Sequence, residues 1–236
     1  METLQPQDVR QELLHLIRMT KTLLQQYIER GEQELPLGTL SLFRPRRVPP
    51  MSLDELYRQI QDCQRCRLGA TRTHLVFGVG NPHAEVMFIG EAPGQEEDQQ
   101  GVPFVGAAGQ LLSRIIQAIR LKREEVYIAN IIKCRPPGNR DPLPDEIDQC
   151  EPYLIQQIQI IRPKIICALG RIAGQVLLKT SASLSTLRGK VHWYQGIKVI
   201  VTYHPAALLR HPQWKRPTWE DVKFLRREYD GVNLEG

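Results

Sequence analysis

Short segments rich in β-branched residues alternate with helical patterns along most of this chain, and this alternation is the strongest constraint on its fold. Four segments have the length and the Val/Ile content of strands: residues 86–89, 126–131, 164–168 and 198–202. Apolar residues at helical spacing lie between them, at 108–120, 145–161 and 171–178. We therefore predict an α/β protein with three layers, α/β/α, around a central four-stranded, mainly parallel sheet.

A turn-forming or polar segment follows each predicted strand. These segments are residues 90–94, 130–140, Gly170 and 204–205. Parallel α/β sheets bind their ligands outside the carboxyl ends of the strands. We therefore expect all four segments to meet in one crevice.

The remaining chain divides into an extension and a linker. Apolar residues recur at helical spacing from residue 8 to residue 30, and residues 32–50 hold four prolines with little periodicity. We expect an N-terminal helical extension at 1–31, a linker at 32–51 and a single enzyme-sized domain at 52–230.

Composition excludes some settings without selecting a function. The net charge is +5 and the pI is near 9.0, which is compatible with a polyanionic partner and equally with an ordinary enzyme. No apolar run reaches the roughly 18 residues of a membrane span, and the N-terminus lacks a secretory signal. We expect a cytoplasmic protein that does not enter a membrane.

Four of the five cysteines form a candidate metal site. Cys63 and Cys66 form a CxxC pair, while Cys134 and Cys150 each lie beside turn-forming sequence. Disulfides are not expected in a reducing compartment, so four thiolates would hold either a structural zinc ion or a [4Fe–4S] cluster. Spacing does not separate these two. Cys167 lies within an apolar run and is expected to be a buried hydrophobic residue.

Three motifs resemble signatures of one family. They are Gly90-Glu91-Ala92-Pro93-Gly94-Gln95-Glu96-Glu97-Asp98 with the segment 101–112, Asn130-Ile131-Ile132-Lys133-Cys134-Arg135-Pro136-Pro137 with Asn139-Arg140, and Tyr203-His204-Pro205-Ala206-Ala207-Leu208-Leu209-Arg210. In order and interval, from about residue 53 to residue 210, the chain resembles the family 4, iron–sulfur type, uracil-DNA glycosylases. The resemblance implies a monomeric base excision repair enzyme that flips uracil out of DNA and hydrolyses its N-glycosidic bond, leaving an abasic site.

The same resemblance assigns the cofactor and the residues around the base. It implies a [4Fe–4S] cluster on Cys63, Cys66, Cys134 and Cys150, with a structural role. Phe104 resembles the residue that stacks on uracil, Asn130 the amide that reads its edge, and His204 the donor to its O2. From the residues alone, Phe104 is equally a core aromatic, Asn130 a turn residue and His204 a structural histidine.

The polar groups that act on water and on the sugar are less clearly indicated. Ala92 stands where many uracil glycosylases carry a water-orienting Asp or Asn, and a small residue is expected here in this family. Ala92 and the next residue, Pro93, are expected to contact the uracil base. Glu91, Glu97 and Asn139 are the remaining candidates to position water or to stabilise the cationic sugar. Glu91 is also a candidate for contact with uracil and Glu97 for exclusion of the thymine methyl, whereas the acidic run at 96–98 is alternatively a solvated loop.

Leucine and basic residues after His204 are candidates for DNA contact. Leu208 and Leu209, expected in an exposed loop, resemble the wedge that fills the gap left by the flipped base; packing on the last helix is the alternative. Phosphate contacts are expected from Arg188, Lys190, Arg210, Lys215 and Arg216.

The competing functional hypothesis is a non-catalytic or covalently trapping uracil-DNA binding protein. Such trapping uses a histidine on an extra basic loop, and residues 187–190 show no such insertion. The sequence leaves open whether damaged bases other than uracil are removed, whether single- or double-stranded DNA is preferred, what residues 1–50 do, and whether the cluster has any redox role.

Overall fold

A computed structural model describes residues 14, 17–22, 25, 29 and 51–231 of the chain. The chain divides into two units, residues 1–50 and residues 51–236. In the first unit every described residue is helical, and the Thr22 hydroxyl donates to the Arg18 carbonyl at 3.0 Å. The rest of the predicted N-terminal extension, and the linker up to residue 50, lie outside the described residues.

The second unit is built on a six-stranded sheet with strand order β1-β3-β2-β4-β6-β5. The strands are β1 (Val79–Gly80), β2 (Val86–Gly90), β3 (Tyr127–Asn130), β4 (Ile165–Leu169), β5 (His192–Tyr194) and β6 (Ile197–Thr202). The four central strands are parallel, as predicted, and β1 and β5 add antiparallel pairs at the two edges. The predicted four-stranded sheet is thus the core of a larger mixed one. The two edge strands span only two and three residues, too few to produce a hydrophobic pattern.

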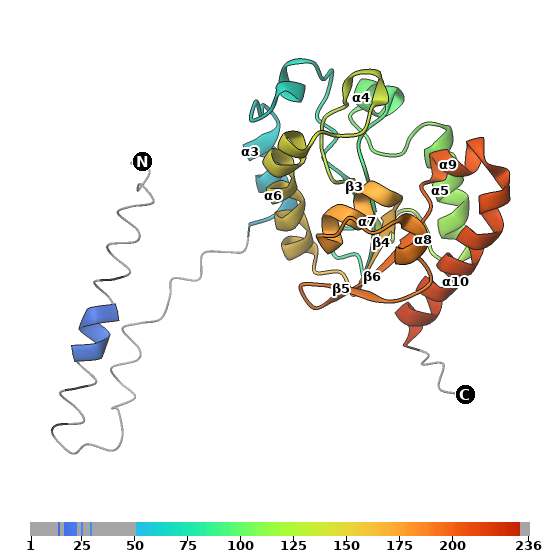
Figure 1. Cartoon of the computed structure of the whole chain (residues 1–236). Helices are drawn as coiled ribbons and strands as arrows, with labels where there is room; N and C mark the ends of the chain where they lie inside the picture. The colour runs from blue at the N-terminus through green and yellow to red at the C-terminus, as the bar shows by residue number, and fades with distance from the viewer. Residues whose placement is uncertain (1–13, 15–16, 23–24, 26–28, 30–50, 232–236) are drawn as a thin grey trace. The chain divides into compact units, whose positions relative to one another are not determined.

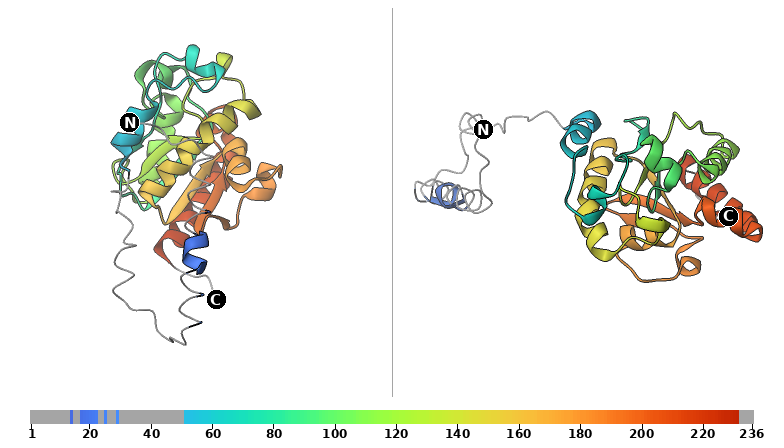
Figure 2. Two further views of the ribbon diagram at one scale, coloured as in Figure 1. Left: turned by 90° about the vertical axis from the view of Figure 1, so that its left-hand side faces the viewer. Right: turned by 90° about the horizontal axis from the view of Figure 1, so that it is seen from above.

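Helices cover both faces of this sheet, which confirms the three-layer α/β prediction (Figures 1 and 2). One face is covered by α3 (Leu53–Ile60), α6 (Pro144–Ile161), α7 (Arg171–Leu178) and α8 (Leu184–Leu187). The other is covered by α5 (Ala107–Ala118) and α10 (Lys215–Asp230). Two short helices, α4 (Gln95–Gln100) and α9 (Pro205–Arg210), follow strand ends, and 3₁₀ turns occupy Arg67–Ala70, Pro137–Asn139 and Pro212–Trp214.

The central strands β2 and β4 are apolar along their whole length because both faces of the sheet are buried there. Along β2, Met87 and Ile89 point into the core beneath α3 and α6, while Phe88 points into the core beneath α5 and α10. Such period-two alternation between two cores is expected for a parallel sheet covered on both sides. Cys167 in β4 belongs to the second core and is 1 % exposed, as predicted for a buried hydrophobic residue.

The described domain begins with a clear helix start. The Ser52 hydroxyl accepts from the Glu55 amide, and the Glu55 carboxylate accepts in return from the Ser52 amide at 2.7 Å. This reciprocal capping satisfies two of the free amides at the start of α3. None of the helices in the described part of the chain is long and apolar enough to cross a membrane.

Candidate active site

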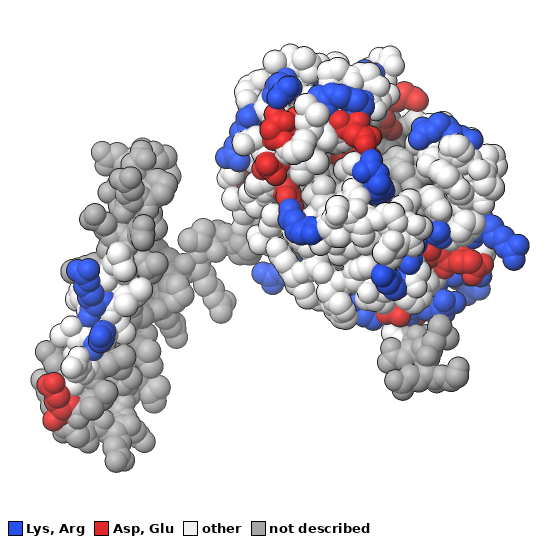
Figure 3. Space-filling view, viewed as in Figure 1, with Lys and Arg blue, Asp and Glu red and all other residues white. Residues whose placement is uncertain are grey.

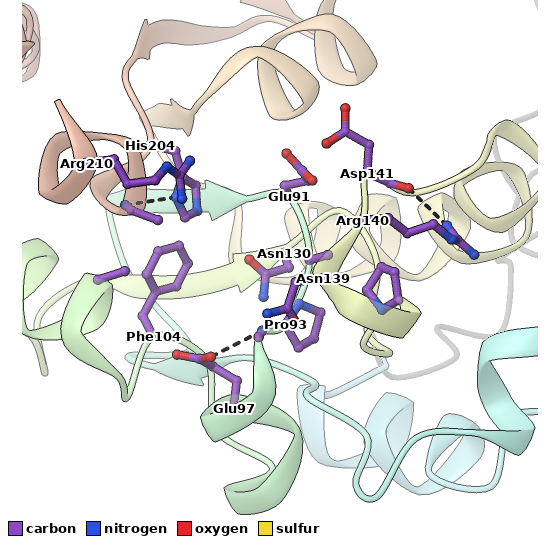
Figure 4. Close-up of a pocket in the computed structure, with 15 residues that line it drawn as sticks. Glu91, Pro93, Glu97, Phe104, Asn130, Asn139, Arg140, Asp141, His204 and Arg210 are labelled. Carbon is purple, nitrogen blue, oxygen red and sulfur yellow. Dashed lines mark hydrogen bonds between the residues drawn. The ribbon is translucent and has the colours of Figure 1, made fainter.

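A pocket of about 320 Å³ lies at the carboxyl ends of the parallel strands. Glu91 follows β2, Asn130 ends β3 and His204 follows β6, so three separate strand ends supply its wall (Figure 4). The full lining is Glu91, Ala92, Pro93, Gly94, Glu97, Phe104, Ala108, Asn130, Pro136, Asn139, Arg140, Asp141, His204, Ala206 and Arg210. The structure therefore brings together every predicted base-binding and catalytic residue.

Asn130 presents an unpaired acceptor to this pocket. Its side chain is 1 % exposed, yet its Oδ1 has no hydrogen-bond partner. A buried amide oxygen without a protein partner is costly, and in native proteins such a group is satisfied by a bound water, an ion or a ligand. Gly90 makes room for it: a Cβ at this position would lie 2.4 Å from Asn130 Oδ1 and 2.6 Å from Phe104 Cζ.

Phe104 is held in an uncommon backbone conformation. Its φ of 55° lies in the left-handed region, which non-glycine residues seldom adopt. The Arg123 guanidinium donates to the carbonyls of Pro103 and Phe104, each at 2.9 Å, and Gly109 approaches so closely that a Cβ there would lie 1.8 Å from the Phe104 oxygen. The ring lies 5.4 Å from the His204 ring, centroid to centroid, with 33° between their planes. The pocket therefore has a fixed aromatic wall.

His204 caps the start of α9, and this bond fixes its tautomer. Its Nδ1 accepts the Ala206 backbone N–H at 3.2 Å, so the neutral ring carries its proton on Nε2. Burial and then the nearby Arg210 lower the pKa of His204 to about 4, although Glu97 acts in the opposite direction. At neutral pH His204 is thus an uncharged N–H donor.

Glu91 and Asp141 place two carboxyl groups at one side of the pocket (Figure 4). Burial, and then the negative charge of Asp141, raise the pKa of Glu91 to about 7, while Arg171 acts against this rise. Asp141 itself receives a hydrogen bond from Arg171 at 2.8 Å. Glu91 therefore exchanges its proton near neutral pH.

Glu97 braces the backbone around Phe104. Its Oε1 accepts from the amides of Val105 and Gly106 at 3.0 and 3.1 Å, and its Oε2 accepts from the Gly94 amide at 3.2 Å. Both carboxylate oxygens are therefore engaged by the protein. Asn139, at a φ of 54°, accepts from Arg135 Nε at 2.7 Å through its Oδ1.

The prediction that Leu208 and Leu209 lie in an exposed loop is wrong. His204 and Pro205 start helix α9, which runs through both leucines and packs against α5. Leu208 faces the interior and is 1 % exposed, whereas Leu209 is 45 % exposed. The histidine–proline pair, which suggested a loop, is in fact an N-cap followed by proline at the first helical position, where proline is favoured.

The sequence also missed part of the lining. Asp141 and Pro136 come from the loop after β3, and Ala108 from the start of α5. Polar residues directly after a predicted strand end were the available signal, and Asp141 lies one residue beyond the segment singled out on that basis. Its relation to Glu91 depends on how this loop folds back over the sheet.

The cysteines predicted as metal ligands line a second, smaller cavity. Cys63, Cys66, Cys134 and Cys150 all contribute to it. Polar groups contact three of the sulfurs: Arg72 donates to Cys134 Sγ at 3.3 Å, the Lys133 backbone amide donates to Cys150 Sγ at 3.2 Å, and Cys63 Sγ lies 3.3 Å from the Tyr153 hydroxyl. Among the described residues, no three or more His, Cys, Asp or Glu side chains are grouped so as to hold a metal ion.

The surface in view carries both signs of charge. Figure 3 shows basic and acidic side chains interspersed over this face of the domain rather than gathered into one basic stripe. Arg188, one of the expected phosphate contacts, is engaged within the protein: its Nε donates to Asp221 at 2.7 Å, and its guanidinium lies over the Tyr203 ring. Arg210, Lys215 and Arg216 are exposed.

Proteins of known family are similar in sequence to this chain. The family model described as the uracil DNA glycosylase superfamily matches residues 77–223. Type-4 uracil-DNA glycosylases are similar over most of their lengths: that of Archaeoglobus fulgidus is 47% identical over 74% of this chain and 92% of its own, that of Saccharolobus solfataricus 48% over 74% and 85%, and that of Thermotoga maritima 41% over 72% and 93%. With this similarity, and with a pocket at the strand ends lined by the residues of its three motifs, the chain belongs to the type-4 family of uracil-DNA glycosylases.

Proposed function

We propose that this protein removes uracil from DNA by hydrolysing the N-glycosidic bond, releasing free uracil and leaving an abasic site. The observation that carries the proposal is the buried, unpaired Oδ1 of Asn130, which faces a pocket walled by Phe104 and His204. Its similarity to proteins named type-4 uracil-DNA glycosylases supports the same reaction.

Base selection follows from the Asn130 amide. Its Oδ1 accepts the N3–H of uracil while its Nδ2 donates to O4. Cytosine presents the reverse pattern, an acceptor at N3 and an amino group at C4, and would leave buried groups unpaired. Phe104 stacks on the flipped base, whose departure from the duplex costs a few kcal/mol.

His204 stabilises the departing uracil anion. Negative charge gathers on O2 as the glycosidic bond breaks, and the Nε2–H of His204 donates to that oxygen. Because the His204 pKa is about 4, this donor is neutral at pH 7 and acts through a preorganised hydrogen bond rather than by giving up a proton. Such a donor contributes roughly 10²–10³-fold to the rate.

Glu91 and Asn139 position the attacking water, and Glu91 stabilises the cationic sugar. Ala92 lacks a polar side chain, so the carboxylate of Glu91, ionised above a pKa of about 7, is the group placed to attract the positive sugar and its attacking water. Asn139, in the loop after β3, helps to hold that water. Glu97 acts indirectly, because both of its oxygens hold the backbone on either side of Phe104.

We also propose that Cys63, Cys66, Cys134 and Cys150 hold a [4Fe–4S] cluster. The four thiols share one cavity, and N–H donors from Arg72 and Lys133 face two of the sulfurs, where they would stabilise thiolate ligands. The cluster would supply structure, tying the segment after α3 to the loop after β3 and to α6. Iron and sulfide content, with absorbance near 400 nm, distinguishes it from the zinc alternative.

DNA is bound around the mouth of the pocket. Leu209 is the remaining candidate for the wedge, and Arg210, Lys215 and Arg216 are free to contact phosphates in a salt-dependent way. Action as a monomer, the cytoplasmic location and the boundaries at residues 31 and 51 remain predictions from the sequence.

A single-uracil oligonucleotide tests the proposal. After incubation and alkali, strand cleavage on a denaturing gel is expected for the wild-type protein and for Gln117→Leu, which replaces an exposed amide on α5. Asn130→Leu keeps the branched arrangement of four side-chain heavy atoms but removes both hydrogen bonds, so excision should fall at least about 100-fold. An intact oligonucleotide with wild-type protein contradicts the proposal, and a band shift that survives denaturation indicates trapping instead.

A further inference from the structure

Four planar side chains form a stack next to the active-site pocket. The Tyr203 and Trp214 rings are nearly parallel, with 4.8 Å between their centroids and 15° between their planes, and the His211 ring packs on Trp214 at 4.3 Å. The Arg188 guanidinium lies 4.3 Å from the centroid of the Tyr203 ring. The Arg188 side chain is only 16 % exposed, whereas His211 is exposed. The contacts of this aromatic stack therefore lead from a mostly buried cation to an exposed ring.

The turn from His211 to Trp214 builds the exposed end of the stack. A proline disfavours helical backbone at the residue before it, so Pro212 ends α9 at Arg210, and His211 has a φ of −131° and a ψ of 78°. The Trp214 amide then donates to the His211 carbonyl at 3.0 Å and closes the turn. The local sequence thus brings two rings, three residues apart, into contact.

Hydrogen bonds fix the buried end of the stack. Arg188 donates to the Asp221 carboxylate at 2.7 Å and to the Pro217 carbonyl at 2.8 Å. Asp221 also accepts from the hydroxyl of Thr202, the last residue of β6, at 2.6 Å. A cation held over an aromatic face attracts that face, so Tyr203 is fixed in turn. A ligand that extends the stack would therefore order few further side chains.

Helix α9 sets the position of the stack relative to the pocket. Tyr203 directly precedes His204, and Arg210, which lines the pocket beside His204, directly precedes His211 (Figure 4). A helix of six residues is about 9 Å long, a distance of roughly two to three nucleotides at the rise of one DNA strand. The exposed ring is therefore within reach of a nucleotide close to one whose base occupies the pocket.

The residues around the exposed ring suit a nucleic acid. Arg210, Lys215 and Arg216 flank the His211–Trp214 turn and are exposed, and in the part of the chain that the structure describes none of them forms an ion pair. Basic side chains of this kind contact phosphates, and aromatic rings stack on bases whose faces are uncovered. A paired base inside a duplex has both faces covered by its neighbours, so the surface suits an unpaired base.

We propose that the exposed end of the aromatic stack, at His211 and Trp214, binds an unpaired DNA base near the flipped uracil on the same strand. The base extends the stack, and Arg210, Lys215 and Arg216 contact the adjoining phosphates. The inference rests on the proposed function for the position of uracil. Because every base has a flat face, this contact holds the strand without reading its sequence.

Substitutions of His211 test the stacking contact. His211→Ala removes the ring, and His211→Phe keeps a flat ring without charge or hydrogen-bonding groups. His83→Ala is the matched control, because His83 is an exposed histidine before β2, at the opposite end of the strands from the pocket. The Kd of each full-length protein for a short, uracil-free oligothymidine is measured by fluorescence anisotropy.

His211→Ala should bind the oligothymidine about tenfold more weakly than the wild type, the usual loss for one base stacked on one ring. His211→Phe and His83→Ala should bind it as tightly as the wild type. Wild-type binding by His211→Ala overturns the inference. Weak binding by His211→Phe also overturns it, since the lost contact would then be a hydrogen bond or a charge.

Salt dependence and a duplex separate stacking from contact with the phosphates. The slope of log Kd against log salt concentration should be unchanged in His211→Ala, whereas Lys215→Ala should reduce it by roughly 0.7, the value for one phosphate contact on a single strand. A fully paired, uracil-free duplex should bind to the wild type and to His211→Ala equally. A reduced slope for His211→Ala, or a tenfold loss on the duplex, would assign His211 to the backbone and overturn the inference.

A strand with one uracil locates the stacked base. Abasic spacers are placed one at a time on either side of the uracil, and at one position the spacer should raise KM about as much as His211→Ala does. That spacer should have no further effect in His211→Ala, because the same contact is already lost. Additive effects at every position would show that ring and base act separately, against the inference.

The measurements on uracil-free DNA do not depend on excision. Weaker binding of oligothymidine by His211→Ala supports the stacking site even where the wild-type protein leaves uracil in DNA. Unchanged binding overturns the stacking site even where the wild-type protein excises uracil.

Discussion

At the residue scale, the pocket pushes two ionisable side chains toward their neutral forms. Burial raises the pKa of Glu91 to about 7 and lowers the pKa of His204 to about 4, because a desolvated site disfavours either charge. His204 therefore stays neutral throughout the range in which a glycosylase is assayed. Glu91 is the pocket residue whose charge changes near pH 7, and Asp141 helps to set that pH.

Asp141→Asn should move the pH dependence of catalysis to lower pH. The negative Asp141 raises the pKa of Glu91, so its removal lowers that pKa, and the released Arg171 lowers it further. If ionised Glu91 is the active form, kcat for single-uracil DNA rises with pH through about 7 in the wild type. In Asp141→Asn this rise should occur at lower pH, and kcat at pH 6 should increase severalfold.

The control for this measurement is Asp148→Asn, which removes an equal charge from an exposed position on α6. Its profile of kcat between pH 5 and pH 9 should match that of the wild type. An unchanged midpoint in Asp141→Asn would show that the carboxylate of Glu91 does not limit the reaction.

Single residues could be predicted where a motif carried them. Phe104, Asn130 and His204 were identified from sequence and lie in one pocket. The influence of Asp141 on Glu91 could not be predicted, because it depends on a loop folding back across strand ends. Leu208 was misplaced because exposure depends on which helix face meets α5, and a six-residue helix gives too little pattern to decide this.

At the element scale, the turn that carries Phe104 and the start of α5 form one interlocked unit. The turn adopts a positive φ at Phe104 only because Gly109 offers no side chain against the Phe104 carbonyl. Arg123, in the turn between α5 and β3, then bonds that carbonyl. The aromatic wall of the pocket therefore depends on the seating of a helix.

Gly109→Ala should push the turn that carries Phe104 away from the start of α5. Its Cβ would lie 1.8 Å from a backbone oxygen, which cannot move aside as a flexible side chain would. We expect a loss of roughly 2 kcal/mol or more in the free energy of unfolding, together with a higher KM for uracil-containing DNA as Phe104 shifts. Thermal unfolding and steady-state kinetics would measure the two effects.

Gln110→Ala is the matched substitution for Gly109→Ala. It changes the next residue of α5, which is exposed, and should alter stability by less than about 0.5 kcal/mol. Equal stability of the two variants would mean that the turn relaxes freely and does not depend on Gly109.

The central strands were predictable, because burial on both faces of the sheet makes their sequences mainly apolar. All four central strands lie within two residues of their predicted bounds at each end. The edge strands β1 and β5 were missed, since β1 is exposed and β5 is anchored mainly by pairing with β6. Their formation depends on the sheet already being present.

At the scale of the whole molecule, the cysteines bring together three segments that lie far apart in the sequence. Cys63 and Cys66 follow α3, Cys134 lies in the loop after β3, and Cys150 lies within α6. The longest chain segment that a cluster across these positions would close runs from Cys63 to Cys150, which lie 87 positions apart in the sequence. Binding of a cofactor to the folded state alone stabilises that state.

Cys63→Ala and Cys167→Ala should therefore differ in iron content and in thermal stability. Both remove one thiol, but Cys167 lies in β4 with its side chain in the core beneath α5 and α10, away from the cysteine cavity. Cys167→Ala should keep full iron content and lose about 1 kcal/mol of stability to the small cavity it leaves. Cys63→Ala should lose iron and absorbance near 400 nm, and its Tm should fall by several degrees because a ligand that stabilised the folded state is gone.

A chelator distinguishes loss of the cluster from loss of packing. The Tm of the wild type and of Cys167→Ala should fall when iron is removed, since both start loaded. The Tm of Cys63→Ala should not change further, because it has no cluster left to lose. If Cys63→Ala instead keeps its iron, or if its Tm still falls with chelator, Cys63 is not a ligand. The segment after α3 is then joined to the rest of the domain by protein contacts, such as the bonds of Arg72 to Gln61, Cys63 and Cys134.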